Sequence, residues 1–240
     1  MGLGFSRFKT WAFCLVVLWG VLGLLRAEEV SALMLRGIKA THDGRYKEAF
    51  HLFKQAHKQG DLLGSAYLGE MYLFGDGMKE DACKAKHYFT LVIKKKPSQN
   101  GDVAVIMAKA LLSSMYSDGS CVKKDWDKTA QLLTEVLEAN GALIRLDGTN
   151  LYVNLDELRA QDFGKFSLRG GMVGASVDMM GQCLEFSPKF KASKQALLIA
   201  KACYEKALEF GLDATKHLQR VQQKLQRQTP KQNPEVKIFL

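Results

Sequence analysis

The 240-residue sequence has few prolines and no apolar run long enough to cross a membrane. Its four prolines and the absence of low-complexity stretches argue against a long linker between domains. The longest apolar run, Trp11–Leu25, has 15 residues, whereas a membrane-spanning helix needs about 20. With 47% hydrophobic and 25% charged residues, the chain has the composition of a globular protein.

The apolar run lies in the setting of a secretory signal. Arg7 and Lys9 precede it without any acidic residue, and the small residue Ala27 follows it just before a change of charge. This order predicts a signal peptide over residues 1–27, so we expect an exported protein, periplasmic or secreted. The alternatives are an uncleaved membrane anchor and residence in the lumen of the endoplasmic reticulum. The absence of any Asn-x-Ser/Thr sequon argues against the second of these.

The positive charge is concentrated near the C-terminus. The formal net charge is +9, and +6 remains without the three basic residues of the signal. Residues 214–240 carry six basic residues and one acid, which leaves residues 28–213 nearly neutral and argues against a nucleic-acid-binding body. Apolar residues recur at helical spacing over 214–225. Residues 214–240 are therefore predicted to form a basic capping helix and tail, or a basic amphipathic segment that contacts an anionic surface.

Cysteine is scarce but even in number after the signal. Four cysteines follow residue 27, as expected for disulfides in an exported chain: Cys83, Cys121, Cys183 and Cys203. They allow three connectivities, and the residues alone do not choose among these or between disulfides and buried thiols. The sequence contains no CxxC pair, which argues against a thioredoxin-type redox site and against a zinc knuckle.

Motifs of known catalytic chemistry are also missing. The sequence has no GxSxG, no HExxH and no glycine-rich phosphate loop. Ser120 and Lys123 form an S-x-x-K tetrapeptide, but without the companion motifs of β-lactam enzymes. We therefore predict that the protein is not an enzyme and has no metal site and no cofactor.

The sequence does contain internal repeats. Copies of a helix–turn–helix pattern recur at offsets of 36 and 44 residues, and a weaker copy precedes Leu212. In the second helix of each copy, apolar residues advance by three or four, so they share one face. Asp81 and Asp125 precede two of these helices and are predicted to cap them.

One glycine within a helical pattern requires an explanation. Gly69 costs about 1 kcal/mol against alanine in a helix interior. We interpret it as a point where the two helices of a hairpin pack closely, because Ala66 lies three residues earlier and Gly37 occupies a similar place in the preceding copy. The residues predicted to make the packing within and between repeats are Ala66, Gly69, Tyr72, Gly77, Ala85 and Phe89.

The segment GSAYLGEMYLFGDGMKEDACKAKHYF, residues 64–89, resembles a Sel-1-like repeat, a relative of the tetratricopeptide repeat. The matching positions are Ala66, Leu68, Gly69, Tyr72, Gly75, Gly77, Asp81, Lys84, Ala85, Tyr88 and Phe89. The resemblance implies an all-α fold, an α-solenoid of stacked helical hairpins over residues 28–213. Residues 141–171 depart from the repeat and are too long for a connection. Ile144 and Leu146, followed by Leu151 and Val153 after a DGTN turn, are typical of a short β-hairpin.

The resemblance also implies a function. Sel-1-like proteins are scaffolds that bind other proteins, often on the concave wall of their first helices, so Tyr67, Glu70 and Lys109 are the candidate partner-binding residues. It further implies a disulfide between Cys183 and Cys203, which would lie on paired helices of one repeat. We thus expect an exported protein–protein interaction scaffold. The alternatives are a cell-wall or β-lactam-related hydrolase that uses Ser120, and a quality-control adaptor of the secretory pathway.

Overall fold

The computed structural model describes residues 32–95, 101–147, 150–156, 158, 171–190 and 193–228. The predicted signal peptide and residues 229–240 lie outside the described residues. Residues 32–42 are helical, and the further elements follow in this order: α2 (Tyr46–Lys58), α3 (Leu62–Phe74), α4 (Ala82–Lys94), α5 (Gly101–Asp118), α6 (Trp126–Ala139), β1 (Leu143–Asp147), β2 (Asn150–Asn154), α7 (Met172–Phe186), α8 (Lys194–Glu209) and α9 (Thr215–Gln228).

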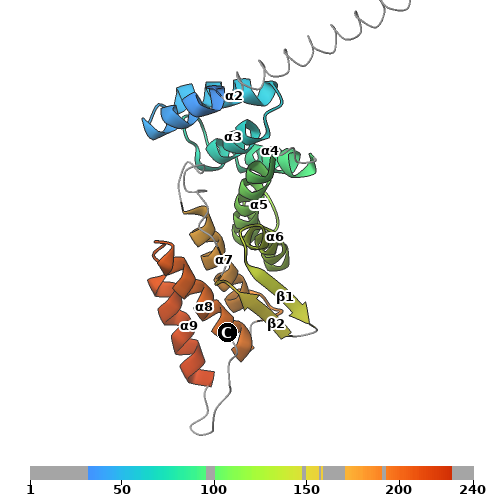
Figure 1. Ribbon diagram of the computed structural model, residues 1–240, viewed down its shortest axis with the longest axis vertical. Coiled ribbons are helices and arrows are strands. Elements are labelled where there is room, and N and C mark those ends of the chain that lie inside the picture. The colour runs from blue at the N-terminus through green and yellow to red at the C-terminus, as the bar shows by residue number, and fades with distance from the viewer. Residues whose placement is uncertain are drawn as a thin grey trace, which may run out of the picture.

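The helices form a stack of pairs. Helix α2 pairs with residues 32–42, and the later pairs each consist of a first helix (α3, α5 or α7) and a second helix (α4, α6 or α8). Each second helix packs on its own first helix and on the first helix of the next pair, and α3 and α7 also pack on α5. Figure 1 shows the resulting elongated body, from α2 at one end to α9 at the other. The predicted all-α solenoid with a β-hairpin insertion is confirmed.

Side-chain caps fix where several helices begin. Asp81 accepts a hydrogen bond from the backbone N–H of Lys84 (2.9 Å), and Asp125 accepts one from Lys128 (2.8 Å). These bonds satisfy donors that the first turn of a helix leaves unpaired, and each such cap stabilises by about 1 kcal/mol. Both predicted caps are therefore present, and they set the register of α4 and α6.

The core consists of two adjoining clusters of buried residues. One cluster of buried residues extends from Leu33 to Met172 and a second from Leu133 to Val221. Helix α6 joins them, because Leu132 packs in the first cluster and its neighbour Leu133 in the second. The pairs therefore form one continuous body, as a solenoid requires.

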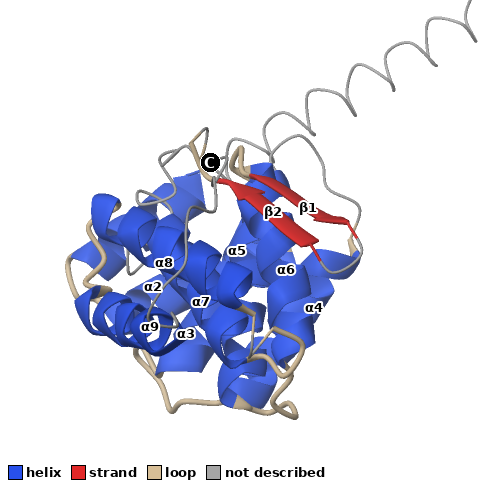
Figure 2. Cartoon of the chain, turned by 90° about the horizontal axis from the view of Figure 1, so that it is seen from below, coloured by secondary structure: helices blue, strands red, loops and turns tan. Residues whose placement is uncertain are grey.

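The insertion forms an antiparallel hairpin beside the helices. Ile144 pairs with Val153, and both pack against the second core cluster, with β1 on α6 and β2 on α8. On the opposite face of the hairpin, Leu143 and Tyr152 are more than half exposed. Figure 2, from below, shows the two strands lying at the edge of the helical stack.

Candidate functional site: the wall of first helices

Glycine allows an aromatic ring of the second helix to enter three of the helical hairpins. A methyl group at Gly69 in α3 would lie 2.4 Å from Cε1 of Phe89, which is fully buried in α4. No Cβ atom tolerates such a distance, so only glycine leaves room for this ring. The same contact recurs in the first and last pairs, between Gly37 and Phe53 (2.4 Å) and between Gly181 and Tyr204 (2.6 Å).

The third pair has no aromatic ring at this position. Ser113 of α5 lies 44 residues after Gly69, and Leu133 of α6 lies 44 residues after Phe89. Both are fully buried, and Thr129 Oγ1 of α6 lies 3.4 Å from the carbonyl oxygen of Ser113. Serine is larger than glycine and leucine is smaller than phenylalanine. The two changes therefore compensate each other in volume, as dense packing requires.

The other predicted packing residues also lie at contacts between helices or repeats. Ala66 and Ala85 are fully buried. Tyr72 is half-buried and stacks on Tyr88, with ring centroids 5.8 Å apart. Gly77 has φ +78°, and a Cβ there would lie 2.8 Å from the carbonyl carbon of Tyr46 in the preceding pair. The turn after α3 therefore requires glycine both for its backbone conformation and for its contact with α2.

A hollow of about 220 Å³ lies where the three first helices meet. Its lining includes Phe74 of α3, Leu111 and Ser114 of α5, and Met172, Ala175 and Met179 of α7. The lining is mostly apolar, and both Phe74 and Ala175 are exposed. Aromatic and methionine side chains are enriched at protein–protein interfaces, where methionine adapts to the shape of its partner.

The three residues predicted to bind a partner do not form an exposed wall, and the prediction is corrected here. Tyr67 is fully buried and stacks on Phe53 (4.6 Å between centroids), and burial raises the pKa of its hydroxyl. Glu70 is also buried, although it contributes to the lining of the hollow. The ammonium group of Lys109 pairs with Glu135 of α6 at 2.6 Å. Helix α3 has neighbours on several sides, so its middle positions are core positions.

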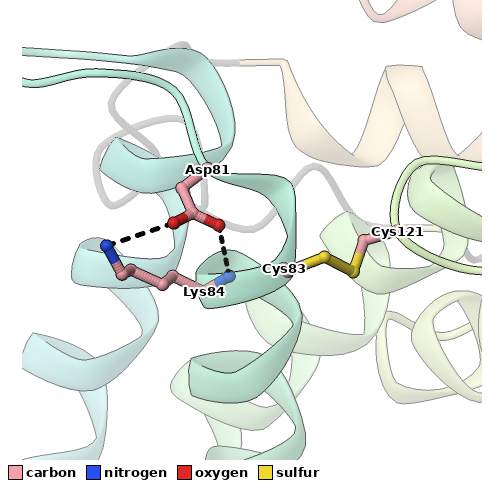
Figure 3. The surroundings of a disulfide bond; sticks show 4 residues. All are labelled: Asp81, Cys83, Lys84 and Cys121. Carbon is pink, nitrogen blue, oxygen red and sulfur yellow. Dashed lines mark hydrogen bonds and ion pairs between the residues drawn. A yellow bond between two sulfur atoms is a disulfide. The ribbon is translucent and has the colours of Figure 1, made fainter.

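The disulfide in the structure is not the predicted one. It joins Cys83, in the first turn of α4, to Cys121, in the turn after α5, with Cα atoms 5.2 Å apart. The bond therefore links the second pair to the third. Figure 3 shows it beside Asp81, whose carboxylate accepts from the backbone of Lys84 and pairs with its ammonium group.

Cys183 and Cys203 are free thiols, which corrects the predicted bridge between them. Both are fully buried in the core that α7 and α8 share, and they pack as small apolar residues. Burial raises the pKa of each thiol to about 12. The reactive thiolate form is therefore disfavoured at both positions.

A buried carboxylate holds α9 on the end of the stack. Glu185 of α7 accepts two hydrogen bonds from Arg220 (2.7 and 2.9 Å), pairs with Lys224 (2.8 Å) and accepts from the hydroxyl of Tyr204 (2.7 Å). Burial alone would raise the pKa of Glu185, but these donors outweigh it and bring the pKa to about 2. Two basic residues of the C-terminal segment thus serve the capping role of α9.

The two residues of the S-x-x-K tetrapeptide, Ser120 and Lys123, lie outside any helix. They lie in the irregular turn between α5 and α6, and no hydrogen bond joins their side chains in the described part of the chain. Among the described residues, no group of three or more His, Cys, Asp and Glu side chains is placed to hold a metal ion. Within the same residues, no helix is both long and apolar enough to span a membrane.

These features define a class, the α-helical-hairpin solenoids. No family model matches the sequence, and no curated protein matches it. Among solved structures, the chain is similar to the crystal structure of a Sel1 repeat protein from Oxalobacter formigenes. The two share 20% identity over 82% of this chain and 84% of that chain, with a TM-score of 0.42. At this level the similarity carries no argument about function.

Proposed function

We propose that the protein is an exported interaction scaffold whose first helices bind apolar side chains of a protein partner. The observation that carries this proposal is the hollow formed jointly by α3, α5 and α7. We call the exposed surface around it the wall. Because the wall combines three successive pairs, a partner that binds there recognises the stacked array and not a single hairpin.

The packing of the array favours binding without rearrangement. The glycine–ring contacts and the Cys83–Cys121 bridge fix the positions of neighbouring helices before a partner arrives. A preformed surface loses little conformational entropy on binding, so more of the contact energy is available as affinity. Recognition would use shape and apolar contact, with no chemical step.

Export is the second part of the proposal. The signal-like order of residues 1–27 supports it, and so does a disulfide, because disulfides persist mainly in oxidising compartments. Sequencing the N-terminus of the protein isolated from its native cells tests this part. A mature chain that begins near residue 28 is expected. A chain that retains residues 1–27 in a reducing compartment would refute export.

The wall is tested by filling the hollow. Ala175 is exposed on α7, so Ala175→Arg places a large charged side chain there without entering the core. Ala139 is also exposed, at the end of α6 and outside the hollow, and Ala139→Arg is the matched control. We expect partners recovered from the native compartment to be lost with Ala175→Arg and retained with Ala139→Arg, while both variants melt like the wild type. Retention of every partner with Ala175→Arg would refute the proposal.

A further inference from the structure

The β-hairpin presents large apolar side chains on its outer face. Leu143 in β1 is 51% exposed, and Tyr152 in β2 is 56% exposed. The inner face is covered, since Ile144 and Val153 pack against the second core cluster. Neither exposed residue lines the hollow of the wall. The outer face of the hairpin is therefore a separate surface, which the fold leaves in contact with solvent.

One edge of β2 is unpaired within the described residues. The sheet has two strands there, so each strand pairs on one side only. In an antiparallel ladder, every second residue points its backbone N–H and C=O groups away from the neighbouring strand. Among the described residues, no backbone hydrogen bond from another element reaches these groups of β2. Such an edge is a template on which a further strand can pair.

The C-terminal residues start within reach of this edge. Helix α9 and strand β2 both pack on α8, and Figure 1 shows α9 and the hairpin at the same end of the elongated body. A chain that leaves α9 must therefore pass one or two helix diameters to reach β2, roughly 10–20 Å. Helix α9 ends at Gln228, and an extended segment 229–234 spans up to about 20 Å. Residues 235–240 then remain to occupy the edge.

Residues 235–240 have the sequence pattern of a strand. They read EVKIFL, in which valine, isoleucine and leucine recur at every second position. This spacing places the three on one face of a strand and Phe239 on the other. Valine, isoleucine and phenylalanine are favoured in strands. Pro234 comes directly before the segment, at a position where a strand tolerates proline.

We propose that residues 235–240 pair with the free edge of β2 of the same chain, as a third strand of the sheet. The aliphatic face of the segment would lie beside Val153, on the side of the core, and Phe239 would lie beside Tyr152 on the outer face. Aromatic pairs on neighbouring strands stabilise a sheet. The added strand also covers an edge with which another chain could otherwise pair. This site goes beyond the proposed function, since it shares no residue with the hollow.

The occupant is this segment and not a second copy of the chain because the segment is tethered. A short connector such as residues 229–234 gives an effective concentration in the millimolar range at a site within its reach. A second copy reaches that level only when the protein itself is millimolar. The two faces of the segment also match the two sides of the hairpin, one covered and one exposed.

Hydrogen exchange of the full chain tests the proposal, read by mass spectrometry on fragments that contain β2. We expect β2 to exchange about tenfold faster in Val236→Ser/Ile238→Ser, because the edge loses its paired strand. The matched control is Gln232→Ser/Asn233→Ser, which changes two residues of the connector and should leave the exchange rate as in the wild type. A chain that ends at residue 233 should exchange fast, and the added peptide PEVKIFL should slow it where a scrambled peptide does not.

Crosslinking provides a second readout. A bismaleimide that spans about 8 Å, the diagonal distance between neighbouring strands, should join the two thiols of Tyr152→Cys/Phe239→Cys within one chain. The control is Leu35→Cys/Phe239→Cys, because Leu35 is 68% exposed but lies in the helical segment 32–42 at the other end of the stack. We expect no link within the chain for this pair.

Two results would overturn the proposal. One is an equal exchange rate of β2 in the wild type and in Val236→Ser/Ile238→Ser. The other is protection of β2 that rises with protein concentration, which would assign the edge to a second copy of the chain. Ala175→Arg should alter neither readout, so failure of the wall and failure of the third strand are distinguishable.

Discussion

Replacing Gly69 by alanine tests the packing on which the array depends. In an ordinary helix interior this change removes about 1 kcal/mol of backbone cost and stabilises the protein. Here the new methyl group would lie 2.4, 2.8 and 3.1 Å from three ring carbons of Phe89. Because the ring is fully buried, it cannot move away without disturbing its neighbours. Overpacking of this kind costs typically 1–3 kcal/mol. We expect the free energy of unfolding to fall by about 1 kcal/mol, net of the gain in helix propensity.

A second substitution shows whether the ring is the cause. Phe89→Leu makes room and copies the Ser113–Leu133 pair of the third hairpin. Alone it should cost roughly 1 kcal/mol. Combined with Gly69→Ala, it should recover at least about 1 kcal/mol relative to the sum of the single changes, because the two side chains compete for one space. Urea denaturation followed by circular dichroism gives all the required values.

The control for backbone effects is Gly174→Ala in α7. A Cβ there would lie 3.2 Å from the Cβ of Phe210, a tight contact without a ring in the way. Its effect should remain within about 1 kcal/mol of zero. If Gly69→Ala is as stable as the wild type, or if the double variant is strictly additive, the glycine–ring account of the hairpins is wrong.

Three further perturbations have defined outcomes in the same denaturation assay. Cys83→Ser/Cys121→Ser should lower the free energy of unfolding by about 4 kcal/mol, the loop entropy for a separation of 38 residues, and an unchanged value would contradict the bridge. Glu185 has a folded pKa near 2, below its unfolded value of 4.5, so the stability it contributes is complete above pH 4.5 and is lost as the pH falls through 2. The wild type should therefore lose about 3 kcal/mol more than Glu185→Gln over this interval, and parallel pH profiles would refute the assignment. Gly77→Ala should cost about 2 kcal/mol, because it strains a φ of +78° and meets the backbone of Tyr46; a neutral result would show that the turn adapts.

Much of the fold could be predicted because repeats are read from local patterns. The caps at Asp81 and Asp125 depend only on residues up to three positions away, and helical periodicity reports one buried face. The β-hairpin was likewise predicted from alternating apolar residues around a turn. The role of Gly69 was predicted as close packing of helix axes, whereas the structure shows that a ring of the partner helix fills the space.

The predictions that were wrong concern which residues of α3 are exposed and which cysteines form the disulfide. Tyr67 and Glu70 were placed on the concave wall, but residues 64–71 of α3 are all buried. The burial of these residues could have been predicted from the sequence, since a helix that is apolar on nearly every side is usually enclosed. The pairing of Cys83 with Cys121 could not be predicted in this way. Cys83 and Cys121 are close because the turn after α5 lies beside the start of α4. This arrangement depends on how successive pairs stack, which local sequence patterns do not report.

The basic C-terminal segment shows how one pattern can serve two roles. Its helical spacing and positive charge predicted either a cap or an anionic contact. In the structure, Arg220 and Lys224 engage Glu185, and His217 lies 2.6 Å from Asp178 of α7. The cap therefore uses charges that the sequence alone assigns to no partner.

Site-specific photo-crosslinking tests the central claim, that the wall of first helices is where this scaffold binds its partner. A benzophenone amino acid is placed at position 175 in the hollow, and in a separate chain at position 139, which is exposed and lies outside the hollow. Irradiation in native cells should join the chain to the same protein in every replicate from position 175, and to none from position 139. Crosslinks of equal yield from both positions, or from position 139 alone, would contradict the claim.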